Sequence, residues 1–193
     1  MRDERLRLGS RLLIGSIAGF VGTMAMTAAM RRMHRRLPAK ERYPLTPREI
    51  IDSGASQIGV ALPNEAAKDV TTAAHFAYGA AMGALIAAMN PDPKKKTGAA
   101  AGFAVWLASY MGWLPAVGTL EPATRHPARR NALMIVAHLV WGASTAAAIR
   151  ELRLARETIR AAGPDTHAPR NPPSPGGGGV GVGWSLRTGP ALH

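Results

Sequence analysis

The chain of 193 residues contains no cysteine, few aromatic side chains and half as many acidic as basic residues. Without cysteine, the protein has no disulfide, no thiolate metal site and no cysteine nucleophile. Aromatic residues make up 5% of the chain, and neither an RNA-binding aromatic motif nor a zinc-knuckle spacing is present. The 12 acidic and 24 basic residues give a net charge of +12, which raises the question of nucleic-acid binding.

Charge is absent altogether from four long apolar segments, at residues 12–30, 70–89, 97–118 and 131–149. A soluble helix of this length carries a charged face opposite its apolar face, and none of these segments does. A helix over residues 131–149 would be roughly 28 Å long, close to the thickness of a bilayer core. Four buried core helices in a soluble protein are the alternative, but nothing in the chain would cover them. The pattern therefore predicts an all-α protein, a four-helix integral membrane bundle.

The basic residues lie at the ends of the apolar segments and not along them. Examples are Arg31, Arg32, Arg35 and Arg36 after the first segment, Lys94, Lys95 and Lys96 before the third, and Arg129 and Arg130 before the last. Basic residues in these positions contact phospholipid head groups. We therefore expect a lipid bilayer with anionic head groups as the partner and no nucleic acid. A homo-oligomer is compatible with the sequence.

The rest of the chain divides around this bundle. Residues 1–11 form a short basic lead, and no convincing cleavage site follows it, so the first apolar segment is interpreted as a retained anchor. The transmembrane domain is predicted to cover residues 12–160, because residues 150–160 keep a helix-forming composition although they carry charge. In residues 161–193, 14 of 33 residues are proline or glycine, which predicts a disordered tail.

The longest connector lies between the first two apolar segments and contains a helix-start pattern. Its motif residues are Pro44, Pro47, Arg48 and Glu49. Thr46 suits the N-cap position, Pro47 the first helical position, and Glu49 completes a capping box. These features predict a short helix over about residues 47–60, which lies along the membrane surface or packs over the ends of the spanning helices.

Small residues recur at four-residue spacing within the apolar segments. Glycines at this spacing allow helix backbones to approach closely in lipid, where the hydrophobic effect no longer drives helix association. The glycines predicted to pack helices together are Gly15, Gly19, Gly79, Gly83, Gly98, Gly102 and Gly142.

The apolar segments also repeat a pattern. The first and third share Gly-x-x-Ala-Gly-Phe, starting at Gly15 and Gly98, and the second and fourth share His-x-x-aromatic-Gly-Ala, starting at His75 and His138. Because each pair of segments crosses the membrane twice, two copies would have the same orientation. The pattern indicates two repeated helical hairpins, with convergent small-residue packing as the alternative.

His75 and His138 are the ionisable side chains that stand out within the apolar segments, and each has an aromatic residue one helical turn later, Tyr78 and Trp141. Intramembrane ionisable groups are candidate functional residues because they are costly to bury in lipid. Three interpretations remain open: a proton, ion or small-solute pathway, a bis-histidine haem site, and a structural role in which neutral histidines bond to neighbouring helices.

The sequence favours a non-enzymatic membrane protein with a structural or proton-responsive core around these histidines. No Asp or Glu lies within the four segments, although proton relays usually include one. No catalytic residues, metal site or cofactor are predicted, and haem is a lesser alternative. Glu121 and His126 could form an acid–base pair in the connector before the last segment, but a solvated loop that contains both by chance is the favoured interpretation.

Several of these residues together resemble the YagU-like family of small bacterial inner-membrane proteins of unknown function. The matching pieces are Gly15-Ser16-Ile17-Ala18-Gly19, Pro44-Leu45-x-Pro47-Arg48, His75, His138-Leu139-Val140-Trp141 and Ile149-Arg150-Glu151-Leu152-Arg153. The resemblance covers about residues 12 to 155. It implies a multi-pass helical fold in a bacterial inner membrane and no established activity. The more basic stretch 31–43 and the glycine-rich tail depart from the family pattern.

Overall fold

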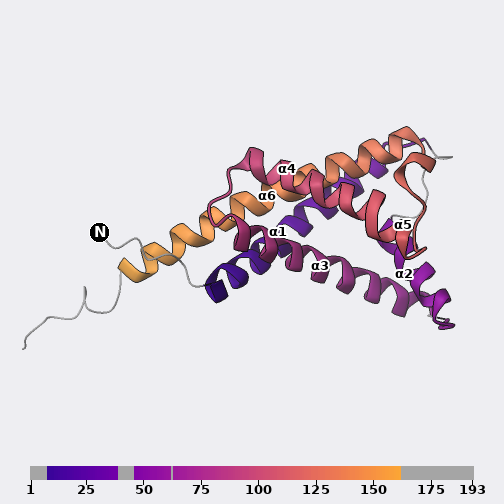
Figure 1. Ribbon diagram of the computed structural model, residues 1–193, viewed down its shortest axis with the longest axis horizontal. Helices are drawn as coiled ribbons and strands as arrows, with labels where there is room; N and C mark the ends of the chain where they lie inside the picture. The colour runs from indigo at the N-terminus through magenta and orange to yellow at the C-terminus, as the bar shows by residue number, and fades with distance from the viewer. Residues whose placement is uncertain (1–7, 39–45, 62, 162–193) are drawn as a thin grey trace, which may run out of the picture. The chain divides into compact units, whose positions relative to one another are not determined.

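The computed structural model describes residues 8–38, 46–61 and 63–161 and is all-α over them (Figure 1). The chain divides into two compact units, residues 1–157 and 158–193, and only residues 158–161 of the second are described. Most of the basic lead, Pro44 and the tail from residue 162 lie outside the described residues. In chain order the helices are α1 (Leu8–His34), α2 (Thr46–Gln57), α3 (Asn64–Met89), α4 (Lys95–Leu107), η2 (Ala108–Trp113), α5 (Leu114–Ala116), η3 (Ala123–Arg125) and α6 (Ala128–Ala161).

Three helices, α1, α3 and α6, are long and apolar enough to cross a membrane. They contain the first, second and fourth apolar segments and run past the predicted boundaries. The extensions are charged or polar but continue the helix, because side chains such as Arg31 and Glu151 have good helix propensity. Helix α6 has 34 residues, so at 1.5 Å per residue it is roughly 51 Å long and exceeds a bilayer core.

The third apolar segment is not one regular helix. Its helix changes from α4 to the π-helical segment η2 and then to the short α5. Pro115 has no N–H to donate to the carbonyl of Met111, four residues earlier, which removes one helical hydrogen bond. The backbone leaves helical geometry at Gly112, with φ −109° and ψ −108°. The break therefore lies three residues before Pro115, at Gly112, where glycine accepts the unusual backbone.

Helix α2 agrees with the predicted connector helix but ends earlier, at Gln57, before Gly59 with φ +71°. Ile50 of α2 packs against the main core, so the helix covers the ends of its neighbours. Arg48 forms an ion pair with Asp52 at 2.7 Å and donates to the Asn64 side-chain oxygen at 3.3 Å. The side chains of Thr46, Pro47 and Glu49 lie outside the described part, so the capping box stays a prediction. The N-cap of α3 is Pro63, and Asn64 is the first residue of the helix.

Helices α1 and α3 form an antiparallel pair through glycines. A methyl group on Gly19 would overlap the carbonyl oxygen of Gly79 and the Cα of Gly83. Gly15 meets Gly83 and Ala87 in the same way, one turn along. There is no room for a Cβ on the α1 side of this crossing, which is the geometry that four-residue glycine spacing permits.

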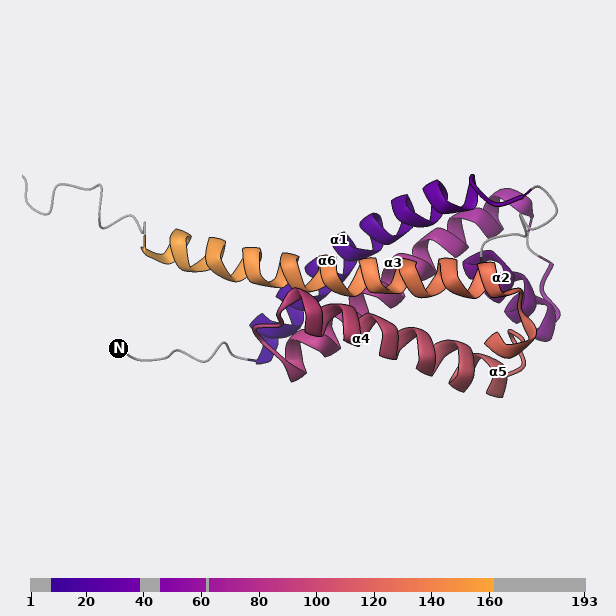
Figure 2. The same cartoon turned by 90° about the horizontal axis from the view of Figure 1, so that it is seen from above.

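Helices α4 and α6 form a second antiparallel pair of the same kind (Figure 2). A Cβ on Gly102 would overlap the His138 carbonyl, and one on Gly98 would overlap the Gly142 carbonyl and the Ala146 methyl. The equivalents of Gly102 and Gly142 in the first pair are Gly19 and Gly79. Gly19 contacts Gly79 on α3, but Gly102 does not contact the equivalent residue of α6, Gly142, through the same atom. It lies instead against the carbonyl of His138, one helical turn before Gly142. The two pairs share a packing motif but differ in register.

The two pairs meet where α6 crosses α1. Trp141 donates its indole N–H to the Gly19 carbonyl at 3.3 Å, at the same point where α1 packs on α3. Three residues further along α1, about one helical turn, Gly22 lies against Thr145, which is fully buried. Gly19 is therefore a junction of three helices.

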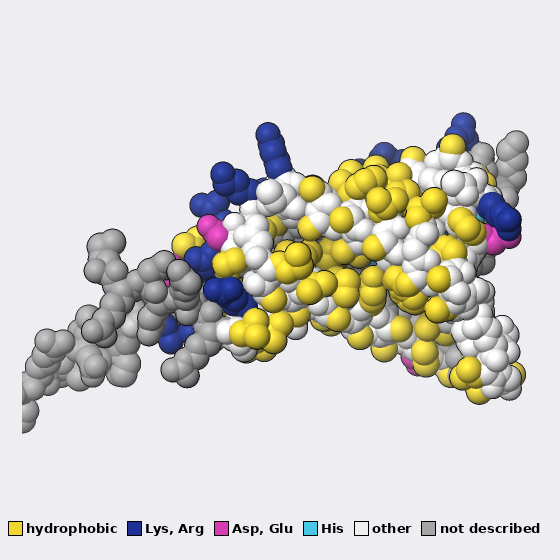
Figure 3. Space-filling view, in the orientation of Figure 1, with side chains coloured by type: hydrophobic (Ala, Val, Ile, Leu, Met, Phe, Trp, Pro, Cys, Tyr) yellow, Lys and Arg dark blue, Asp and Glu magenta, His cyan; other side chains and the backbone are white. Residues whose placement is uncertain are grey.

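The surface of the helices is largely apolar. Figure 3 shows hydrophobic side chains over the middle of the visible face, with Lys and Arg side chains towards its two ends. Several large apolar side chains of α1 are exposed, including Leu13 at 64%, Phe20 at 48% and Met24 at 55%. Apolar exposure on this scale marks an interaction surface in a soluble protein and is ordinary where helices face lipid.

Candidate functional site

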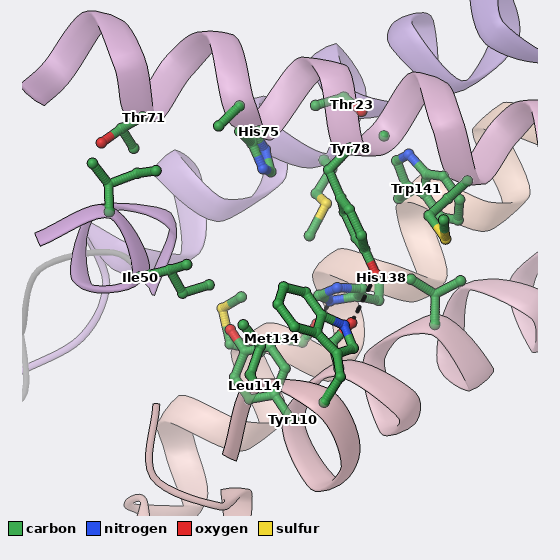
Figure 4. Close-up of a pocket in the computed structure, with 18 residues that line it drawn as sticks. Thr23, Ile50, Thr71, His75, Tyr78, Tyr110, Leu114, Met134, His138 and Trp141 are labelled. Atoms are coloured by element: carbon green, nitrogen blue, oxygen red, sulfur yellow. Dashed lines mark hydrogen bonds between the residues drawn. The ribbon is translucent and has the colours of Figure 1, made fainter. Parts of the chain in front are cut away.

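A cavity of about 270 Å³ lies between α1, α2, α3, η2 and α6 (Figure 4). We call this cavity the chamber. The four candidate residues from the sequence, His75, Tyr78, His138 and Trp141, all line it. The first two come from α3 and the last two from α6, so the fold brings together two segments that are 63 positions apart in the chain.

His138 is held by its own helix. Its Nδ1 lies 2.7 Å from the backbone carbonyl of Met134, and the residue is only 7% exposed. A carbonyl oxygen can only accept, so Nδ1 carries the proton and donates. In the neutral imidazole Nε2 is then a lone-pair acceptor, and it has no hydrogen-bond partner among the described residues. The ring also meets the edge of Tyr110, with 6.1 Å between centroids.

His75 is held by a neighbouring helix. Its Nε2 lies 3.3 Å from the hydroxyl of Thr27 on α1. That hydroxyl donates its own hydrogen to the Thr23 carbonyl at 2.7 Å, so it accepts at His75, and Nε2 is the donor. In the neutral ring Nδ1 is therefore the acceptor, and no described residue bonds to it. Both histidines thus present one acceptor nitrogen to the chamber.

Tyr78 joins α3 to η2 across the chamber. Its hydroxyl lies 3.0 Å from that of Ser109, and its ring centroid lies 6.2 Å from that of Trp113. Tyr78 is 37% exposed and Trp113 46% exposed, although both line the chamber. The chamber therefore reaches the molecular surface at these two aromatic side chains.

The sequence did not identify the contribution of η2 and α2. Ser109 and Tyr110 of η2 and Ile50 and Ile51 of α2 line the chamber. Pro115 was the available signal, because a proline within an apolar helix frees a carbonyl upstream and π-helical turns often occur at functional sites.

The chamber has an apolar lining with a few polar groups. None of its described lining residues is Asp, Glu, Lys or Arg. No group of three or more metal-ligand residues occurs in the described part of the chain. The two histidines offer different ring nitrogens, and the one usual for haem ligation, Nε2, bonds to Thr27 in His75. The observed bonds therefore do not favour a bis-histidine haem.

Glu121 and His126 do not form the acid–base pair that the sequence allowed. The carboxylate of Glu121 lies 3.4 Å from Arg125, whereas His126 Nε2 lies 3.1 Å from the backbone carbonyl of Glu121. All three side chains belong to the connector around η3. These contacts stabilise a turn and leave the carboxylate away from the imidazole.

No protein-family model, curated protein or solved structure matches the chain.

Proposed function

We propose that this protein is a non-enzymatic, multi-pass membrane protein whose chamber binds a small, largely apolar molecule. The observation that carries the proposal is the convergence of His75, Tyr78, His138 and Trp141 on one cavity. Ligand sites are usually concave and apolar, with a few polar groups that orient the ligand. The volume of about 270 Å³ is near the lower end of the usual range, roughly 300–1,000 Å³.

Membrane insertion is supported by the three long apolar helices and by the exposed apolar side chains along them. The interrupted helix from α4 to α5 is the fourth spanning segment of the proposal, because it is apolar and packs closely on α6 at Gly98 and Gly102. Its π-helical turn borders the chamber with Ser109 and Tyr110, which are buried, and irregular backbone is tolerated at membrane depth where it lines a cavity. The bacterial inner membrane as location rests on the sequence resemblance to the YagU-like family.

With four spans, the N-terminus and the end of α6 lie on the same side of the membrane. We favour the cytoplasmic side, because the short loop with Lys94, Lys95 and Lys96 should follow the positive-inside rule. A reporter that is active only outside the cytoplasm, fused after Arg160, is expected to stay inactive. Strong reporter activity would reverse the orientation.

Binding is favoured over permeation by the lining of the chamber. A proton relay would have to run through histidine, tyrosine and serine alone, since no described lining residue is a carboxylic acid. A proton-responsive role of the histidines can be tested separately. Replacing both His75 and His138 with Gln keeps hydrogen bonding but removes titration. Any pH-dependent ligand binding of the wild type between about pH 5 and 8 should vanish in a folded double variant if the histidines titrate.

The binding proposal is tested with naphthalene as an apolar probe and with protein reconstituted in lipid nanodiscs. Discs that hold the protein should retain more naphthalene than empty discs of the same lipid. Val105→Phe, which places a larger side chain in the chamber wall, should abolish the excess. Val136→Phe is the matched control, because Val136 is 43% exposed and does not line the chamber. Equal uptake by wild-type and empty discs would refute the proposal.

A further inference from the structure

We propose that the ligand of the chamber is an uncharged, lipid-soluble molecule with a hydroxyl group, which donates its O–H to a histidine nitrogen. This ligand class presupposes the proposed function, because a chamber that binds nothing has no ligand class. It goes beyond that function by specifying the charge, the phase from which the ligand comes and the group that is recognised.

The absence of charge in the lining excludes charged ligands. A buried ion needs an opposite charge or many hydrogen bonds, since its desolvation costs several kcal/mol that an apolar wall does not return. No described lining residue supplies a carboxylate, an ammonium or a guanidinium group. An amine that is protonated at neutral pH, or a carboxylate, would therefore enter the chamber without a partner.

The opening of the chamber indicates a ligand that dissolves in lipid. Tyr78 and Trp113 both line the chamber and are exposed on its outside. In the proposed membrane orientation their rim lies between α3 and η2, within the apolar part of both helices. At the end of the bundle near α2, Ile50 and Ile51 cover the chamber. A molecule that passes the aromatic rim comes from the hydrocarbon phase.

The tautomers of the two histidines specify a hydrogen-bond donor. Because His138 Nδ1 bonds to Met134 and His75 Nε2 bonds to Thr27, the nitrogens that remain, His138 Nε2 and His75 Nδ1, both accept. Both histidines line the chamber, whose walls are largely apolar, so a ligand that donates to one of these nitrogens is bound in preference to one that cannot.

The hydroxyl pair of Tyr78 and Ser109 favours an O–H group over other donors. The bond between them uses one of their two hydrogens, so the other can be donated to a ligand. A hydroxyl group is the smallest group that can donate to an imidazole and also accept from this pair. The aromatic rings around the chamber suit a flat apolar body next to that group (Figure 4).

The test compares 2-naphthol with its methyl ether, 2-methoxynaphthalene, in nanodiscs with and without the protein. The two probes share the ring system and the oxygen, and only the naphthol can donate. After correction for uptake by empty discs, wild-type protein should bind 2-naphthol about tenfold more tightly, equivalent to about 1.4 kcal/mol. This is the upper end of what one neutral hydrogen bond contributes. The charged probe 2-naphthalenesulfonate should not bind.

Variants of the two histidines then show which ring nitrogen is responsible for the preference for 2-naphthol. In one of the two variants His138→Leu and His75→Leu, the one that removes the accepting nitrogen, the preference for the naphthol should fall to about equal binding of both probes, and the other variant should keep it. If both variants keep the wild-type preference, donation to a histidine is refuted. His126→Leu is the control, because His126 lies in the connector and outside the chamber lining, and it should keep the wild-type ratio.

Each outcome decides between the two proposals. If wild-type protein binds both probes equally, the hydroxyl class is wrong and the binding chamber stands. If the sulfonate binds best, the uncharged class is wrong. If neither naphthalene nor 2-naphthol binds above empty discs, the proposed function itself fails. The wild-type comparison needs no variant to fold, so the ligand class is tested even if both histidine variants are lost.

Discussion

In the α1–α3 pair, the histidine bonds to a side chain of the partner helix, whereas in the α4–α6 pair it bonds to its own backbone. His75 depends on Thr27 of α1, and His138 depends on the Met134 carbonyl one turn earlier in α6. The two helix pairs nevertheless pack through the same kind of glycine contacts. The same local pattern thus supports one histidine whose tautomer is fixed by tertiary structure and one whose tautomer is fixed locally.

The difference follows from the register of the two pairs. The second pair is displaced by one helical turn, so Gly102 lies against the backbone of His138, while the equivalent Gly19 lies against Gly79, beyond His75. The displacement leaves the His75 ring within reach of a side chain from α1. We expect the two pairs to respond differently to the same kind of change, which can be measured.

The largest effect on stability is expected from adding a methyl group to a glycine at a helix–helix contact. Gly19→Ala and Gly102→Ala each place a methyl group where a backbone carbonyl lies, which forces the helices apart, so each should lose at least about 3 kcal/mol of stability. Gly9→Ala, in the open part of α1, should be close to neutral. Unfolding in mixed detergent micelles measures this. If Gly19→Ala is as stable as Gly9→Ala, close packing at the first pair is refuted.

A smaller effect should separate the two histidines. Thr27→Val removes the acceptor of His75 Nε2 and should cost about 1 kcal/mol. The ¹⁵N shifts of labelled histidine should show a change of tautomer at His75 and none at His138. Thr72→Val is the matched control, because Thr72 bonds only within α3, to Lys68. A shift at both histidines would contradict local fixation of His138.

The link between the two pairs at the chamber rim should contribute less. A double-mutant cycle of Tyr78→Phe and Ser109→Ala measures the hydroxyl bond between α3 and η2. We expect a coupling free energy of about 0.6 kcal/mol, as is usual for side-chain bonds between membrane helices. Additive effects of the two substitutions would mean that the bond does not hold the rim together.

The smallest effect concerns the turn between the two pairs. Arg153 of α6 bonds to the Pro91 carbonyl at 2.9 Å and to Asp92 at 3.0 Å. Because Asp92 is largely exposed, Asp92→Asn should cost no more than about 0.5 kcal/mol and less at high salt. A loss as large as that of Thr27→Val would show that this turn, and not the glycine contacts alone, holds the pairs together.

The sequence predicted the helices because their signal is local. Long charge-free segments, glycine spacing and the proline-containing connector specify backbone conformation and apolar faces without knowledge of the partners. Three of the four apolar segments are long apolar helices as predicted, and α2 lies in the predicted connector. In the third segment, Pro115 indicates a break near the end, but the local sequence does not show that the backbone leaves helical geometry three residues earlier, at Gly112.

The sequence by itself determined the all-α class, the apolar segments and the residue types at the chamber, His75, Tyr78, His138 and Trp141. Only the tertiary structure decided that these four residues share one cavity with Ser109 and Ile50. It also decided which nitrogen of each histidine accepts, and that the two helix pairs differ by one turn. The reason is that periodicity fixes which face of a helix a residue occupies, whereas register and bond partners depend on the neighbouring helix, which the local sequence does not contain.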